Sequence, residues 1–241
     1  MNINNTAILI FPHQLFEQNP LIEKNGVFFL IEEPLFFSQY KFHVQKLIMH
    51  RSSMKFYYDF LKEKNLNVTY LENQNSLSDI KNLIPYLKKE NFDNISYINC
   101  IDNYLDSRIS NISKQNNIKI DVLESPMFLN SKSEIDTFFG NDKSKFLHST
   151  FYTEQRKKNS ILIDQNGKPE GGKWTFDAEN RKKYPKNKIP PKIKELEIDK
   201  YFSEAVNYIK LNFKENPGAF PKKPQYPTSF KLSKRWLKDF L

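Results

Sequence analysis

The chain has 241 residues, of which 39% are hydrophobic and 15% aromatic, so it is long enough and apolar enough to fold around a core. No apolar run approaches the roughly 18 residues of a membrane-spanning helix, and the N-terminus MNINN lacks the basic region of a signal peptide. A single cysteine, Cys100, excludes a disulfide framework and fits a cytoplasmic protein that does not bind a membrane.

The net charge of +9 favours a polyanionic partner such as DNA. Only five of the 37 basic residues are arginines, however, and arginine binds phosphate better than lysine because its planar guanidinium can donate two hydrogen bonds at once. A lysine-rich surface produced by compositional bias is an alternative explanation of the charge, so DNA contact stays open.

Short apolar runs alternate with helical patterns over the first half of the chain. The patterns predict strands at 7–11, 27–31, 67–71, 94–99 and 118–124, and helices at 39–64, 77–89 and 104–116. Pro85 is expected to kink or break the second of these helices. Such alternation indicates βαβ units and therefore an α/β fold with a doubly wound, mostly parallel sheet.

The alternation stops after Ser125. The remaining patterns predict helices at 131–139 and 149–163, a loop at 164–181, a Lys- and Pro-rich linker at 182–198, a helix at 199–213 capped by Asp199, a Pro-rich connector at 217–227 and a final helix from Thr228. We therefore divide the chain into an α/β domain (1–148), a helix, loop and linker segment (149–198) and the start of a helical region (199–241).

Polar residues directly follow the first two predicted strands: Pro12, His13 and Gln14 after the first, Glu32 and Glu33 after the second. Ligands of doubly wound sheets bind at the carboxyl ends of strands, so we predict that these five residues line one pocket. His13 and one glutamate should then lie within about 10 Å of each other. The two glutamates would point to opposite sides of an extended chain. The alternative is an ordinary turn with a solvated His13.

One further feature is weaker. His43, Lys46, His50 and Arg51 lie on one predicted helix, where a basic face would hold an anion or simply be solvated. No GxGxxG, GKS, HExxH or GxSxG motif occurs, so we predict neither a metal site nor a catalytic residue.

The stretch GGKWTFDAENR at 171–181 is either a binding loop or a structural loop held by its aromatic residues. We expect Trp174 and Phe176 to be buried, and Asp177, Asn180 and Arg181 to form a hydrogen-bonded cluster.

Four stretches carry a resemblance to a known family: AILIFPHQLF (7–16), FFLIEEPLFF (28–37), FHVQKLIMHRSSMKFYYDFL (42–61) and GGKWTFDAENR (171–181). In this order they resemble the N-terminal half of bacterial cryptochrome/photolyase-related proteins, the branch that includes the iron–sulfur (6-4) photolyases. The resemblance implies a Rossmann-like antenna domain followed by a linker and short helices. The family's light-driven DNA repair or blue-light sensing uses FAD and a 4Fe-4S cluster in a helical C-terminal half, and the resemblance implies that this chain corresponds to the N-terminal half alone.

The resemblance also implies a ligand. A lumazine- or deazaflavin-like antenna chromophore would bind at the sheet edge, with Phe36 about where lumazine-binding relatives have an acidic residue. That departure weakens the case for lumazine, and Phe36 would either stack on another flat chromophore or fill the core. With Cys100 alone, the purified chain is expected to carry neither FAD nor iron.

Partners are expected at the C-terminus. One face of the final predicted helix is apolar, with Leu232, Trp236, Leu237, Phe240 and Leu241. This face would pack on an FAD-binding helical half, on a second chain or, by default, on the α/β domain. We predict self-association through this tail, and a more monomeric chain once 228–241 are removed. A stand-alone Rossmann-like protein that binds a nucleotide or flavin-like ligand, and a truncated remnant, are the alternative interpretations.

Overall fold

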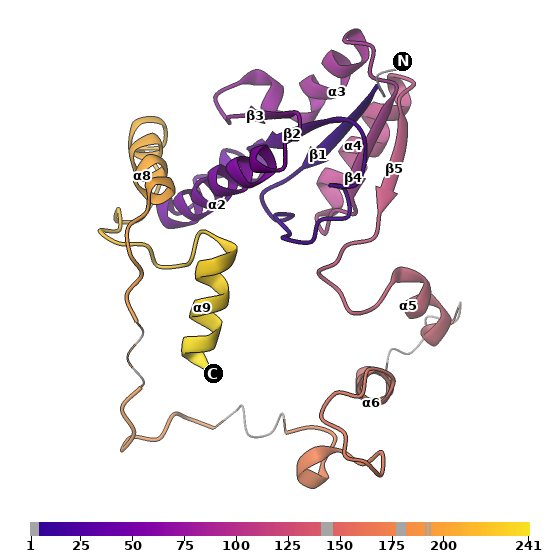
Figure 1. Ribbon diagram of the computed structural model, residues 1–241, viewed down its shortest axis with the longest axis vertical. Coiled ribbons are helices and arrows are strands. Elements are labelled where there is room, and N and C mark those ends of the chain that lie inside the picture. The colour runs from indigo at the N-terminus through magenta and orange to yellow at the C-terminus, as the bar shows by residue number, and fades with distance from the viewer. Residues whose placement is uncertain (1–4, 141–146, 177–181, 191, 193) are drawn as a thin grey trace. The chain divides into compact units, whose positions relative to one another are not determined.

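The computed structural model describes residues 5–140, 147–176, 182–190, 192 and 194–241. The chain forms two compact units. Unit 1 combines Met1–Met127 with Lys194–Leu241, and unit 2 is Phe128–Ile193. Figure 1 shows the course of the chain through both. Among the described helices, none combines the length and the apolar character needed to cross a membrane.

Unit 1 contains a five-stranded sheet in the order β3-β2-β1-β4-β5, and every neighbouring pair is parallel. The strands are β1 (Thr6–Ile10), β2 (Val27–Ile31), β3 (Val68–Leu71), β4 (Asn94–Ile98) and β5 (Lys119–Leu123). β1 and β2 are almost entirely buried, as expected of central parallel strands with both faces covered. The predicted α/β class with a doubly wound parallel sheet is confirmed.

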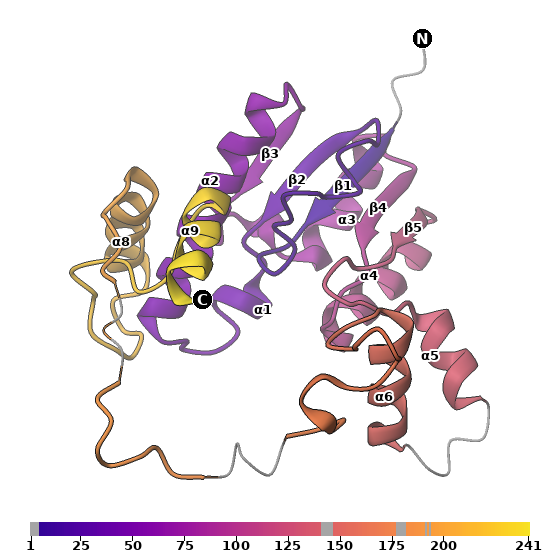
Figure 2. The same cartoon turned by 60° about the horizontal axis from the view of Figure 1, so that its bottom comes forward.

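Alternate residues of the strands enter two separate cores. Ile8, Ile10 and Phe28 pack with α2 (Val44–Glu63) and α8 (Lys200–Asn212). Ala7 and Leu9 pack with α3 (Ile80–Lys89) and α4 (Asn103–Gln115). This period of two places the two pairs of helices on opposite faces of the sheet. Figures 1 and 2 show α2 running alongside α8, apart from α3 and α4.

Three helices end in the same way. Asn65, Asn91 and Asn117 follow α2, α3 and α4 with φ of 60°, 63° and 52°. Asparagine tolerates this left-handed conformation at a helix end, where it reverses the chain towards the next strand. Pro85 lies inside α3 without ending it, so the predicted break does not occur.

The long helix begins later than predicted. α2 starts at Val44 because the Nδ1 atom of His43 accepts a hydrogen bond from the Gln45 amide and caps the helix. Upstream of it lies a four-residue helix that was not predicted, α1 (Pro34–Phe37), with Pro34 at its first position and the Glu33 side chain as its cap.

The C-terminal segment of unit 1 belongs to its core. α8 is capped by Asp199, as predicted, and buries Phe202, Ala205 and Ile209 against α2. The connector after α8 crosses the start of α2 so closely that a Cβ at Gly218, whose φ is +104°, would lie 2.2 Å from the His43 ring. Only glycine fits at that crossing.

The last helix, α9 (Phe230–Phe240), has Ser229 as its cap and buries none of its residues. At its N-terminal end, the Phe230 ring makes edge-to-face contacts with Phe56, Tyr57 and Phe60 of α2, at centroid distances of 5.1 to 6.1 Å. The far end of α9 stays exposed: Leu237, Phe240 and Leu241 are all more than half accessible.

Unit 2 contains α5 (Lys132–Phe139), α6 (His148–Lys158) and the 3₁₀ turn η2 (Glu170–Gly172). A capping box between Ser131 and Glu134 begins α5. α6 ends five residues before its predicted end, because Ser160 and Leu162 adopt positive φ. The 3₁₀ turn η1 (Ser76–Ser78) precedes α3 in unit 1.

Candidate functional site

The loops that follow β1, β2 and β4 meet at the carboxyl edge of the sheet. β1 lies between β2 and β4, and the chain leaves β1 towards β2 but reaches β4 only after β3. This reversal in strand order is the topological switch point, where open α/β sheets bind their ligands.

Gln14 ties the loop after β1 to the end of β4. Its side chain is 1% exposed, and Nε2 donates to the Ile98 carbonyl at 2.7 Å and approaches Cys100 Sγ at 3.9 Å. Its Oε1 atom is buried and has no hydrogen-bond partner among the described residues. Pro12, also buried, only directs the backbone here.

His13 lies between aromatic rings. Its ring centroid is 5.1 Å from that of Phe36 and 6.4 Å from that of Phe11. Both imidazole nitrogens are closed to solvent and make no hydrogen bond within the described structure. Burial lowers the pKa of His13, and the negative charge of Asp102 opposes this only in part. The ring is therefore neutral at pH 7, with one donor and one acceptor unused.

Glu33, the second residue after β2, is fully buried. Its Oε2 atom accepts from the Leu35 amide at 2.5 Å, which caps α1. Its Oε1 atom has no hydrogen bond to any described residue, and the nearest cation, Arg108 Nη1, is 3.8 Å away. Burial raises the pKa of Glu33 to about 7, so protonated and ionised forms coexist at neutral pH.

These residues form what we call the sheet-edge cluster: His13, Gln14, Glu33 and Phe36. The Phe36 ring covers His13, and the Phe36 amide donates to the Glu33 carbonyl at 2.9 Å, so a chain of contacts joins the loop after β1 to the loop after β2. Several polar atoms of the cluster are buried without a hydrogen bond to any described residue, which is unusual in a native interior.

Glu32 is not part of this cluster. As expected for an extended chain, it points the opposite way from Glu33. Its Oε1 atom accepts from Arg51 Nη1 at 2.8 Å and from the Tyr70 hydroxyl at 2.6 Å, and its Oε2 atom accepts from the Asn73 amide at 2.9 Å. Every acceptor of this buried carboxylate is therefore occupied by protein.

Glu32 belongs to a second cluster that was not predicted, the Arg51 cluster (Glu32, Arg51, Glu72, Glu204 and Tyr208). The Arg51 guanidinium is 1% exposed and contacts all three carboxylates at 2.5 to 3.1 Å. It also stacks on the Tyr208 ring, 3.3 Å from the centroid. The cluster joins β2, α2, the end of β3 and α8, so its role is to hold α8 against the sheet of unit 1.

The predicted basic face of α2 is not a single surface, because its four members have different surroundings. Arg51 is buried in its cluster, His43 caps the helix, and Lys46 lies over the Phe42 ring at 3.4 Å. His50 packs against Phe36 and Phe37, and burial lowers the pKa of His50 to about 4. The interpretation of this face as an anion site is wrong.

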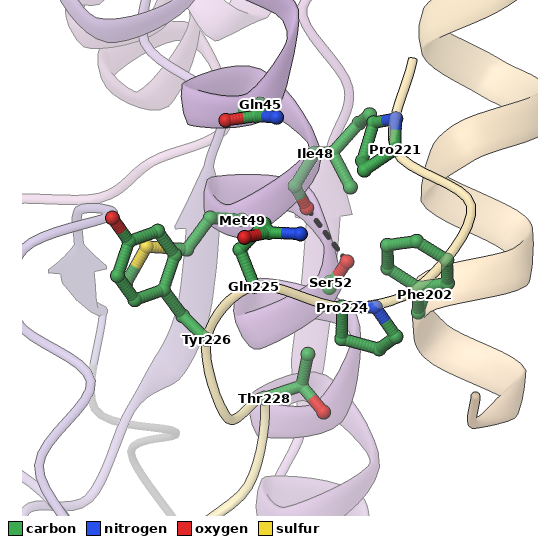
Figure 3. Close-up of a pocket in the computed structure, with 10 residues that line it drawn as sticks. All are labelled: Gln45, Ile48, Met49, Ser52, Phe202, Pro221, Pro224, Gln225, Tyr226 and Thr228. Atoms are coloured by element: carbon green, nitrogen blue, oxygen red, sulfur yellow. Dashed lines mark hydrogen bonds between the residues drawn. The ribbon is translucent and has the colours of Figure 1, made fainter. Parts of the chain in front are cut away.

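A small cavity lies between α2, α8 and the connector that leads to α9. Figure 3 shows Phe202, Pro221 and Pro224 facing Ile48 and Ser52, whose hydroxyl donates to the Ile48 carbonyl at 2.6 Å. Its volume of about 20 Å³ is room for about one water molecule. It is a packing gap rather than a ligand site.

The predicted burial of the 171–181 loop is only partly correct. Trp174 is half-buried, but Phe176 is 46% exposed, so the expectation that both rings are buried is wrong. The ring of Phe176 lies over Gly171, where a Cβ would come within 2.9 Å of it. The predicted cluster of Asp177, Asn180 and Arg181 lies outside the described residues.

Comparisons with known proteins agree with this fold. The family described as deoxyribodipyrimidine photo-lyase-related protein matches residues 8–224. The chain is 35% identical over 197 residues to uncharacterized protein R852 of Acanthamoeba polyphaga mimivirus, which covers 78% of this chain and 98% of that protein. It is 33% identical over 102 residues to a (6-4) photolyase of Agrobacterium fabrum, which covers 42% of this chain and 20% of the photolyase.

Proposed function

The chain belongs to the deoxyribodipyrimidine photo-lyase-related protein family, as its motifs predicted, and we propose that its sheet unit binds a planar chromophore- or nucleotide-like ligand at the sheet-edge cluster. In this proposal the ligand is an antenna or related group of the lumazine or deazaflavin type. The light-driven chemistry on DNA belongs to an FAD-binding helical half, and the chain itself is not catalytic.

The observation that carries the proposal is the set of buried polar atoms without hydrogen bonds: Gln14 Oε1, Glu33 Oε1 and both His13 nitrogens. A buried polar atom left unpaired costs about 1–3 kcal/mol, which a ligand with matching groups would recover. Gln14 offers an acceptor for a ring N–H group. Glu33 accepts when ionised and donates when protonated, so it suits either a ring N–H or a ring carbonyl.

The aromatic rings favour a flat ligand. The atoms without hydrogen bonds are closed to solvent, with the Phe36 ring over His13. A ligand reaches them when this half-buried ring, on the four-residue helix α1, turns aside. Phe36 would then stack on the ligand instead of on His13.

Calorimetric titration of the purified chain with FMN and with a ribityl-lumazine tests the proposal. We expect one-to-one binding of at least one of them, and at least about tenfold weaker binding in Glu33→Gln, which keeps the α1 cap but loses the acidic proton. Gln18→Leu, an exposed change on the loop after β1, is the control. The proposal would be contradicted if neither of the two ligands bound and the purified protein carried no chromophore.

A second candidate is a stand-alone ligand-binding protein without photochemistry. The observation that favours it is the mimivirus relative, 98% of which is matched, so a chain of this extent occurs as a family member. Adding the part of the Agrobacterium photolyase outside the matched 102 residues, together with FAD and lesion-containing DNA, separates the two candidates. Light-dependent repair that rises with this chain favours the first, and ligand binding without any gain in repair favours the second.

A further inference from the structure

Unit 2 contains a cavity that none of the roles above uses. It lies between one face of α6 and the segment that begins at Trp174, and its volume is about 630 Å³. Sites for small molecules typically fall between about 300 and 1,000 Å³. Its lining residues are His148, Ser149, Tyr152, Thr153, Trp174, Thr175 and Phe176.

Arg156 fixes the two walls of this cavity relative to each other. It is 5% exposed, and its guanidinium donates to the carbonyls of Ile161, Leu162 and Trp174. The guanidinium also lies 5.3 Å from the centroid of the Trp174 ring. The arginine therefore holds the Trp174 segment against α6 from within unit 2, so the cavity is formed before any ligand arrives.

The cavity is aromatic and polar at once. Tyr152 and Phe176 are 41% and 46% exposed, so their rings are accessible for stacking. Ser149 contributes a hydroxyl group and His148 an imidazole, while the Thr153 hydroxyl donates to the Ser149 carbonyl at 3.0 Å and keeps its oxygen as an acceptor. None of the lining residues that the structure describes is acidic, and the Lys157 ammonium lies 5.4 Å from the centroid of the Trp174 ring.

We propose that this cavity binds a nucleobase. The base has a flat π face for the aromatic rings and a polar edge for the hydroxyl groups, and the phosphate of the nucleotide that carries it would be attracted by the nearby lysine. The same chemistry is found in a free mononucleotide and in an unstacked base of a single strand, and the experiment below separates these sources. The proposal does not depend on the sheet-edge ligand, since all of its residues lie in unit 2.

Tryptophan fluorescence tests the proposal directly. The chain has two tryptophans, so Trp236→Phe leaves Trp174 as the only reporter in the full chain. We titrate this variant with thymidine monophosphate, with an eight-residue oligothymidylate and with a duplex of the same length. Saturable quenching by the mononucleotide and the single strand identifies a base site for either source. Quenching by the single strand alone identifies a base held within a strand.

Substitutions at exposed rings complete the test. Phe176→Ala and Tyr152→Ala should each weaken binding roughly 5- to 150-fold, the range measured when a stacking aromatic is removed. Phe128→Ala, an exposed ring of unit 2 outside the cavity, should leave binding unchanged. Circular dichroism verifies that each variant is folded.

Two results would overturn the proposal. One is the absence of Trp174 quenching with all three titrants. The other is binding to the duplex that weakens with salt but is unaffected by Phe176→Ala and Tyr152→Ala, because it would show contact with phosphates through surface lysines instead.

Discussion

Among single residues, Arg51 has the largest expected effect on stability, because three carboxylates and one aromatic ring depend on it. Arg51→Met leaves Glu32 buried without a counter-charge, which should cost about 3–5 kcal/mol of unfolding free energy. Urea denaturation measures this. Glu32→Gln in the same chain should restore part of the loss.

The matched control for Arg51 is Lys234→Met, which removes an exposed ion pair with Glu17 and should cost at most about 1 kcal/mol. Equal losses in the two variants would mean that the Arg51 cluster has no special role in stability.

Because the Glu33 carboxyl is buried, we predict that the stability of the chain depends on pH. The pKa of its carboxyl is about 7 in the folded chain, against 4.5 for an ordinary glutamate, because burial disfavours the charged form. The folded state therefore holds more protons than the unfolded state between these values, and stability falls as the pH rises from about 4.5 to 7. The full loss is about 3 kcal/mol.

The Glu33→Gln variant cannot ionise at this position. Between pH 4.5 and 7 its unfolding free energy should therefore fall by about 3 kcal/mol less than that of the unsubstituted chain. Urea midpoints of both proteins at pH 4.5, 5.5, 7 and 8 give the comparison. Parallel pH profiles for the two proteins would show that Glu33 does not titrate as described.

Among the secondary-structure elements, α9 gives the clearest prediction, which is that the chain associates through it. Trp236, Leu237 and Phe240 share its exposed apolar face, while Phe230 anchors its start on α2. Because removal of 228–241 would also remove that anchor, the sharper variant is Trp236→Ser with Phe240→Ser. Light scattering should show concentration-dependent association of the 241-residue chain and a monomeric double variant. Lys231→Ser with Lys238→Ser, on the polar face, is the control.

A chain that stays monomeric at high concentration would show that α9 alone does not drive association.

The elements also show what can be predicted from the sequence. All five strands were predicted within one residue, and the two central ones were the easiest because buried parallel strands are uninterrupted apolar runs, such as Ala7–Ile10. α1 was missed because it has only four residues and begins through a side-chain cap. α6 was extended too far because its end depends on positive φ at Ser160 and Leu162, residues with no strong preference for it.

The candidate site was only partly predictable. His13, Gln14 and Glu33 were placed at the sheet edge by their position after strands, which the topology guarantees. The Arg51 cluster was missed because its carboxylates come from distant parts of the sequence: the pairing of β2 with β3 brings Glu32 and Glu72 together, and the packing of α8 adds Glu204. The cavity at Trp174 likewise depends on the carbonyls that Arg156 contacts, which no side-chain pattern reveals.

At the scale of the whole molecule, unit 1 is assembled from two separate parts of the chain. The described residues 182–190 between these parts are all exposed. A site-specific protease sequence inserted between Lys186 and Asn187 should therefore be cut without unfolding unit 1. Because Phe202, Ala205 and Ile209 are buried against the sheet unit, the two fragments should co-elute in native size-exclusion chromatography and separate in urea.

Glu204→Gln weakens the ion pair of α8 with Arg51 and should make the cut fragments separate at a lower urea concentration. Separation of the fragments of the unsubstituted chain in buffer alone would show that α8 is held only by its covalent connection.

Because unit 1 is assembled from two separate parts of the chain, its packing partners are synthesised at different times on the ribosome. α2 is complete at Glu63, but its partner α8 begins only at Lys200. At translation speeds of roughly 5–20 residues per second, the apolar face of α2 remains exposed for on the order of ten seconds until α8 is synthesised. During that interval Glu204 has not yet reached Arg51, and the nascent chain presents an unfinished core. This face of α2 is therefore where a chaperone at the tunnel exit would engage the growing polypeptide.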